Sequence, residues 1–80
     1  MRVTEYFLDS RHRVDRHDIK MEWIEYAVRH PVKKVRQPDN RIRLWAKIEA
    51  SEGRYLRVIL LEDGETVHNA FFDRRFKENV

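Results

Sequence analysis

"RIRLWAKIEA", residues 41–50, alternates between apolar and polar side chains almost without interruption. The apolar series is Ile42, Leu44, Ala46, Ile48 and Ala50. The intervening series is Arg41, Arg43, Trp45, Lys47 and Glu49. Because successive side chains of a β-strand point to opposite faces of a sheet, this pattern predicts a strand with one buried face. The other face is then either a plain solvated surface or a surface that binds a polyanion.

Further strands are predicted on both sides of this segment. Residues 54–62 are apolar on both faces, which is typical of a central strand that is covered on both sides. Asp63 and Gly64 form a tight hairpin signal, after which residues 65–73 return as another strand. Residues 32–37 favour an edge strand. The sequence therefore predicts an antiparallel meander of three to four strands.

Two helices are predicted upstream of the sheet. The first is a short, highly charged helix over residues 11–17, with Asp9 or Ser10 as its N-terminal cap. The second covers residues 19–30, where apolar residues recur at three- and four-residue steps and form one stripe. Asp18 is the expected cap of this second helix. These helices are expected to cover one face of the sheet.

The remaining segments complete a single α+β domain over residues 1–80. Residues 3–8 favour a short strand, Pro31 ends the second helix, and residues 74–80 favour a short helix or a tail. Eighty residues leave no room for a second core. The expected architecture is a twisted antiparallel sheet packed against two N-terminal helices.

Composition narrows the class of function without deciding it. The chain contains no cysteine, which excludes a disulfide framework and thiolate chemistry and suits a reducing cytoplasm. Its longest apolar run, residues 58–61, is too short to span a membrane, and no signal-peptide pattern is present. Arginine supplies 12 of the 17 basic residues. Arginine binds phosphate in two-pronged fashion and stacks on bases, but it also forms ordinary surface ion pairs.

One short pattern points to a known family. Arg16-His17-Asp18-Ile19 precedes the predicted second helix, Pro31 follows that helix, and the last strand leads into an arginine-containing segment, residues 69–75. With the order of elements, this pattern resembles the RelE/BrnT-like ribonuclease toxins, and most closely the BrnT-type toxins and related uncharacterised small domains. The likeness covers residues 9–77. The chain departs from it in having Asp18 where a glycine is usual, and only Phe76 where RelE-type toxins commonly have a C-terminal aromatic base.

The resemblance implies a metal-independent endoribonuclease toxin of a toxin–antitoxin system, acting in the cytoplasm without a cofactor. Its partners would be RNA and an antitoxin protein that covers the basic face, with a homodimer as a further option. Two alternatives remain open: a non-catalytic module of the same fold that binds RNA or a protein, and a small structural domain whose charges only keep it in solution.

Candidate site residues follow from the chemistry of RNA cleavage. Cations fixed on a rigid sheet stabilise the negative charge that develops when a 2′-hydroxyl attacks a phosphate. Histidine is the simplest general base near neutral pH, and tryptophan can stack on a base. The predicted catalytic residues are His17, His68, Arg43, Lys47 and Arg74. The predicted RNA-binding residues are Arg41, Arg57, Arg75 and Trp45.

Each candidate also has a purely structural interpretation. The strand cations could pair with Glu49, Glu62 or Glu65, and such surface pairs contribute below about 1 kcal/mol each. The histidines could pack between helix and sheet, and Trp45 could be a core or interface anchor. The tail arginines could begin a short helix capped by Asp73. No metal site is expected, because His12 and His17 are spaced so that they would lie on different faces of a helix.

Overall fold

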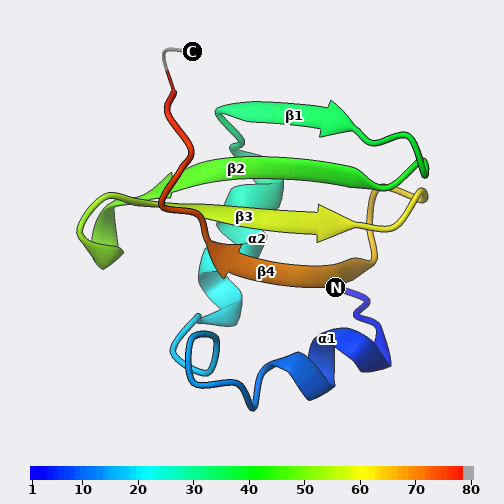
Figure 1. Cartoon of the computed structure of the whole chain (residues 1–80), viewed down its shortest axis with the longest axis horizontal. Coiled ribbons are helices and arrows are strands. Elements are labelled where there is room, and N and C mark those ends of the chain that lie inside the picture. The colour runs from blue at the N-terminus through cyan, green and yellow to red at the C-terminus, as the bar shows by residue number, and fades with distance from the viewer. Residues whose placement is uncertain (79–80) are drawn as a thin grey trace.

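The computed structural model describes residues 1–78 and has an α+β fold (Figure 1). Its elements are α1 (Glu5–Ser10), α2 (Met21–Arg29), β1 (Lys33–Arg36), β2 (Ile42–Ile48), β3 (Arg54–Leu60) and β4 (Val67–Phe72), with a short 3₁₀ turn, η1 (Glu49–Ser51), between β2 and β3. The four strands form one antiparallel sheet in the order β1-β2-β3-β4. The predicted meander is therefore confirmed, with each strand slightly shorter than expected.

The buried face of the sheet is built by the alternation along β2. Its apolar residues from Ile42 to Ile48 are all buried, and Leu44 lies opposite Val58 of β3. On β3, Leu56, Val58 and Leu60 are fully buried, whereas the other face of this strand is only half-buried. Burying a side chain of this size stabilises the fold by about 1.5–3 kcal/mol. The chain leaves the strand after Ile48, so the predicted inward position of Ala50 is exposed in η1.

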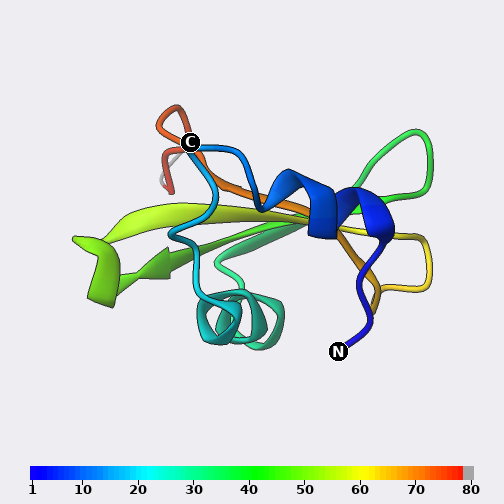
Figure 2. The ribbon, with the colours of Figure 1, turned by 90° about the horizontal axis from the view of Figure 1, so that it is seen from below.

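Helix α2 covers this apolar face and packs against β2 and β3 (Figure 2). Ile24 and Ala27 on its inner side are fully buried, as the predicted stripe requires. The helix ends at Arg29, just before Pro31. Asp18 is not its cap, which corrects the prediction: Ile19 is buried in the core, and the helix begins only after Lys20, which holds the extended cap conformation.

The N-terminal segment is a helix and not the predicted strand. Thr4 caps α1, because its Oγ1 accepts a hydrogen bond from the Phe7 amide at 3.0 Å. Only Val3 makes a strand-like contact, a parallel bridge to Val67. Phe7 is 1% exposed and anchors α1 to the core. Capping by Thr4 and burial of Phe7 therefore prevail over the β-forming preference of this stretch.

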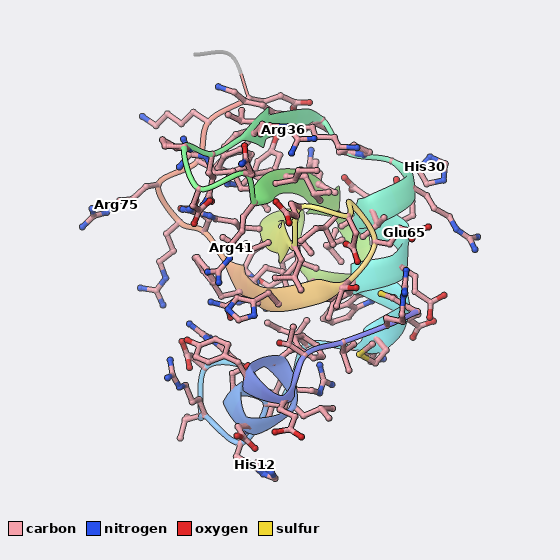
Figure 3. The ribbon with its side chains drawn as sticks, turned by 90° about the vertical axis from the view of Figure 1, so that its right-hand side faces the viewer. His12, His30, Arg36, Arg41, Glu65 and Arg75 are labelled. Atoms are coloured by element: carbon pink, nitrogen blue, oxygen red, sulfur yellow. The ribbon has the colours of Figure 1, made fainter. Side chains whose placement is uncertain are left out.

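Residues 11–17 form a series of turns, which corrects the predicted first helix. Asp9 and Ser10 do not cap it, because they lie inside α1. The segment has no apolar stripe to bury, and its arginines bond outside it: Arg11 donates to the Ile19 carbonyl and Arg16 to Asn69. Helix α1 also packs against β4 and lies beyond that edge of the sheet, so α2 is the only helix within residues 1–78 that covers a face of the sheet (Figures 2 and 3).

The tail crosses the sheet face that lies opposite α2. Residues 74–78 contain turns but no helix, so the short-helix option fails for the part of the tail that is described, while residues 79–80 fall outside the described range. Asp73 caps no helix. Its carboxylate instead accepts hydrogen bonds from the Arg75 amide and the Trp45 indole.

The turn between η1 and β3 holds an unusual backbone conformation. Glu52 has φ 58° and Gly53 has φ 70°, so two successive residues are left-handed. Glycine adopts this backbone region without steric strain, and a side-chain carbon at Gly53 would also displace Lys47, whose Cε would lie 3.2 Å away. Glu52 adopts the same region although it has a side chain, at a steric cost of about 1–2 kcal/mol.

Candidate nucleic-acid interface

The sheet face opposite α2 carries the polar series of β2 together with its partners on β3 and β4. Strand register places Trp45 opposite Arg57, and Arg57 opposite Phe71, so these three side chains cross three strands in one line. The register follows from antiparallel pairing, in which residues directly opposite each other point to the same face. Figure 3 shows Arg41 on this side of the sheet and His30, at the end of α2, on the other side.

Arginine and aromatic side chains alternate along this line. The Arg57 guanidinium carbon lies 5.5 Å from the Trp45 ring centre and 5.3 Å from that of Phe71. Arg43 lies 5.6 Å from Trp45 at one end, and Arg16 lies 5.3 Å from Phe71 at the other. We call these five residues, Arg43, Trp45, Arg57, Phe71 and Arg16, the arginine–aromatic row. Contacts of this type stabilise by about 0.5–1 kcal/mol at exposed sites and by more when desolvated.

The row gathers positive charge that is only partly neutralised. Burial lowers the pKa of Arg57, and the nearby charge of Arg43 lowers it further, while Asp73 opposes both effects. The Arg57 Nη1 to Asp73 Oδ2 distance is 3.8 Å, so this carboxylate is close but not hydrogen-bonded to that atom. Two guanidinium groups from neighbouring strands thus lie near enough to repel each other, with one carboxylate beside them.

Three donors of the row are buried and lack a partner. The Nε atoms of Arg16, Arg43 and Arg57 have no hydrogen-bond acceptor among residues 1–78. A buried N–H without an acceptor is costly, and native structures satisfy most such groups. Each arginine of the row thus carries one unsatisfied donor, which lowers the stability of the fold.

Arg16 enters the row from the turn-rich segment between the helices. Its Nη1 donates to Asn69 Oδ1 at 2.8 Å, and this same oxygen accepts the Ala70 amide. The Arg16 side chain is 12% exposed, and its Nε lies 3.8 Å from Asp15 Oδ2. Sequence reasoning missed Arg16 as a site residue because it was assigned to a solvated helix. The sequence signal that could have identified Arg16 is its position next to His17 in the Arg16-His17-Asp18-Ile19 pattern.

His68 lies at an irregularity in the sheet. The register between β3 and β4 shifts at Ile59 and Leu60, which leaves His68 outside the regular pairing. Its Nδ1 lies 3.1 Å from Thr4 Oγ1, and its ring stacks on Tyr6 with centres 4.7 Å apart. Burial lowers the pKa of His68 below 6.5, and the charge of Arg41 lowers it further. The imidazole is therefore predominantly neutral at pH 7, with a guanidinium nearby.

The other predicted residues do not join the row. Lys47 Nζ lies 3.5 Å from Glu49, and His17 Nδ1 lies 3.0 Å from Asp18 in the same loop. Arg74 lies outside the row but lines a cavity that shares Phe71 with it. Arg75 is exposed and points away from the fold (Figure 3). The structure thus brings Arg43 and Arg57 together with Trp45, and places His68 near Arg41, but leaves the remaining candidates apart.

The tail covers much of Trp45, which is 7% exposed. Phe76 stacks on the indole, with ring centres 4.8 Å apart and planes within 16°. The indole N–H donates to Asp73 Oδ2 at 2.9 Å. Tyr55 also contacts Phe76, with ring centres 5.0 Å apart, and donates from its hydroxyl to Glu78 at 2.8 Å. An aromatic ring and a carboxylate of the chain itself therefore occupy one end of the row.

Within residues 1–78, no group of three or more His, Asp or Glu side chains is placed to hold a metal ion. No helix of that range is long and apolar enough to cross a membrane. Comparison of the chain with protein-family models, with curated proteins and with solved structures gave no match.

Proposed function

We propose that this chain binds single-stranded RNA on the arginine–aromatic row and cleaves it as a metal-independent endoribonuclease toxin. The observation that carries the proposal is the row itself, in which guanidinium groups and rings alternate across three strands. Guanidinium groups bind phosphate, and aromatic rings and arginine planes stack on unpaired bases. A single strand presents both chemistries at once, whereas free phosphate would leave the aromatic rings of the row unused.

RNA binding is tested with a fluorescently labelled oligonucleotide at about 50 mM and about 200 mM salt, because phosphate contacts make affinity fall steeply with salt. Arg43→Ala and Arg57→Ala should each weaken binding about tenfold and reduce the salt slope. Arg29→Ala is the control, since Arg29 is exposed in α2, outside the row. Weak binding that does not depend on salt, or equal affinity of all four proteins, would contradict the proposal.

Cleavage is assigned to His68, which lies at the irregularity between β3 and β4 with Nδ1 3.1 Å from Thr4 Oγ1, and whose pKa is lowered by burial and by the charge of Arg41. In the proposed reaction His68 removes the proton from a 2′-hydroxyl, whose oxygen attacks the adjacent phosphorus. The bond to the 5′-oxygen breaks, which leaves a cyclic phosphate and a 5′-hydroxyl once that oxygen has taken up a proton. Arg41 and Arg43 stabilise the additional negative charge on the phosphate.

The cleavage step has its own test. End-labelled RNA is incubated with the protein in excess chelator, and fragments are resolved by length. His68→Ala should abolish cleavage while RNA affinity changes little, which separates catalysis from binding. If the wild-type protein binds RNA but produces no fragments, the chain is a binding module without activity.

The toxin role adds a partner to the proposal, an antitoxin protein that covers the row. Induced expression of the chain alone should arrest cell growth, and the double variant Arg43→Ala with Arg57→Ala should relieve the arrest. Unimpaired growth with wild-type protein present at a normal level would remove the toxin role and leave RNA binding to be judged by the titration.

A further inference from the structure

A cavity of about 360 Å³ lies where the loop before α2 meets β3, β4 and the tail. Its walls combine two carboxylates, two guanidinium groups and two rings: Asp15, Asp18, Arg54, Arg74, Phe71 and Phe72. Phe71 also belongs to the arginine–aromatic row, where it contacts Arg16 and Arg57. The cavity and the proposed RNA surface therefore share Phe71, so a strand bound along the row would pass beside the cavity.

The charges of the cavity restrict what it can bind. The side chains of Asp15 and Asp18 are 70% and 86% exposed, so a ligand can reach them, although Asp15 Oδ2 lies 3.8 Å from Arg16 Nε and Asp18 Oδ1 lies 3.0 Å from His17 Nδ1. Two carboxylates disfavour a bare phosphate, and two guanidinium groups disfavour a simple cation. The ligand that fits must present N–H donors to the carboxylates and acceptors to an arginine, on a flat body that can lie against Phe71.

The arginines of the cavity differ in how firmly they are held. Arg54 lies 4.0 Å above the Phe72 ring and donates from Nη2 to Ser51 Oγ at 2.6 Å, so its position is fixed by the fold. Arg74 is exposed, lines the cavity and makes no side-chain hydrogen bond or ion pair within residues 1–78, so its guanidinium can turn toward a ligand. We therefore assign recognition of the acceptor edge to Arg74 and treat Arg54 as part of the wall.

We infer that the cavity selects guanine in the bound strand, an inference that rests on the proposed function. Guanine offers adjacent N1–H and N2–H₂ donors, which one carboxylate accepts together, and O6 and N7 acceptors, which arginine binds in two-pronged fashion. Uracil has a single ring N–H between two carbonyl oxygens, which a carboxylate repels. Adenine and cytosine each offer one amino group beside an acceptor nitrogen. Of the four bases, guanine alone offers two adjacent donors to a carboxylate and two adjacent acceptors to an arginine.

The test compares three RNA heptamers: seven uridines, and the same strand with a central guanosine or a central adenosine. Wild-type protein should bind the guanosine strand about tenfold more tightly than the other two, the discrimination expected of one good two-pronged contact. In Asp15→Asn with Asp18→Asn, this preference should disappear, because the amides no longer offer acceptor-only groups. Affinity for the uridine strand should be unchanged or slightly higher.

Matched controls separate recognition from net charge. Asp9→Asn with Glu25→Gln removes the same two negative charges at exposed positions outside the cavity and should keep the guanosine preference. Arg74→Ala should reduce the preference, whereas Arg29→Ala on α2 should not. Circular dichroism spectra of all variants establish that they are folded before affinities are compared.

The outcomes distinguish this inference from the function on which it rests. Salt-dependent binding of all three wild-type complexes with equal affinity would overturn the guanine site and leave RNA binding intact. A preference that survives in Asp15→Asn with Asp18→Asn would also overturn it, because the selecting groups would lie elsewhere. Failure of every heptamer to bind at about 50 mM salt would remove the proposed function and the guanine site together.

Discussion

His68 shows how burial and a neighbouring charge act in the same direction on one side chain. Its pKa lies below 6.5 because of burial and then because of Arg41. As the pH falls through 6.5, the unfolded chain takes up a proton at this site before the folded chain does. The His68 contribution to stability is therefore complete above pH 6.5 and decreases toward the lower folded-state pKa. The same shift keeps the imidazole available as a base at neutral pH.

We predict that Arg41→Ala raises the pKa of His68, because one of the two causes of its depression is removed while burial remains. The measurement is an NMR titration that follows the His68 ring proton between pH 4 and 8. Arg29→Ala, which removes an equal charge on the α2 side, should leave the titration unchanged. If Arg41→Ala does not move the pKa, the two side chains are not electrostatically coupled in solution.

Asp63 gives a second pH dependence, located in the hairpin between β3 and β4. Hydrogen bonds from the Thr66 hydroxyl, the Thr66 amide and the Glu65 amide lower the pKa of Asp63 to about 2. A depressed carboxyl pKa contributes stability that is complete above 3.8 and lost as the pH falls through the folded-state value. Asp63→Ala should therefore be less stable than wild type at pH 6, with the difference shrinking from pH 4 to 2. Urea unfolding at several pH values measures it, and a constant difference would contradict the assignment.

The sequence predicts which face of a strand a side chain occupies. It does not predict which side chains of other elements lie beside it. Alternation along 41–50 places Arg43 and Trp45 on one face, as observed. The proximity of Arg57 depended on strand register, which the hairpin turn sets and the alternation does not. Arg16 was missed because a turn-rich segment was assigned to a helix. Predicting its bond to Asn69 would have required knowing the path of a loop across 53 residues of sequence separation.

The C-terminal tail occupies part of the arginine–aromatic row and would compete with RNA for it. Phe76 stacks on Trp45, the same ring that the proposed RNA would use. We predict that Phe76→Ala increases RNA affinity about two- to tenfold, because an aromatic pair contributes about 0.5–1.5 kcal/mol and no longer has to be displaced. The experiment uses a Trp23→Phe background, so that fluorescence reports Trp45 alone, and its emission should shift to the red.

Phe76→Tyr is the matched control, since it keeps the stacked ring and should bind RNA as wild type does. A lower affinity of Phe76→Ala would show instead that the tail contributes to binding. In that case Phe76 belongs to the RNA surface and does not compete for it.

Helix α1 depends on one buried ring. Phe7 is 1% exposed, whereas its neighbour Leu8 is 52% exposed. Phe7→Ala should destabilise the protein by about 3–5 kcal/mol, while Leu8→Ala should change stability by less than about 0.5 kcal/mol. Chemical unfolding measures both, with Phe7→Leu as the milder variant if Phe7→Ala has no folded baseline. Equal effects of the two alanine variants would mean that α1 does not pack against the core in solution.

The elements that formed as predicted are those with a strong periodic signal. Helix α2 and three strands have apolar residues at a fixed repeat, and hairpin turns mark the strand ends. The segment before α2 has no repeat, so β-propensity at residues 3–8 and charge at 11–17 were misleading. There the capping hydrogen bond of Thr4 and the burial of Phe7 and Ile19 decide the structure. Such local and tertiary effects leave little trace in the sequence pattern.

On the scale of the whole molecule, the row should reduce stability. The like charges of Arg43 and Arg57 repel each other, and three Nε donors are unsatisfied within residues 1–78. We predict that Arg43→Met raises the free energy of unfolding by about 1 kcal/mol, which corresponds to about 4–8 °C in Tm for a domain of this size. Methionine keeps most of the contact with Trp45 but removes the charge. RNA affinity should fall at the same time.

Thermal unfolding and RNA titration of Arg43→Met test this trade-off together. A lower Tm would show that stacking of Arg43 on Trp45 outweighs the repulsion from Arg57, and that the row stabilises the fold. Arg29→Met on the α2 side controls for the change in net charge. Functional surfaces commonly carry such a stability cost.

Glu52, the left-handed residue at the turn into β3, offers a way to compensate for that cost. Glycine or asparagine tolerates this backbone region better than glutamate. The variant Glu52→Gly should therefore have a higher Tm than the wild-type chain. Destabilising substitutions elsewhere could then be compared in a parent protein that stays folded. Glu52 lies outside the arginine–aromatic row, but its neighbour Ser51 accepts hydrogen bonds from Arg54, so the guanosine preference of such a parent chain has to be measured again.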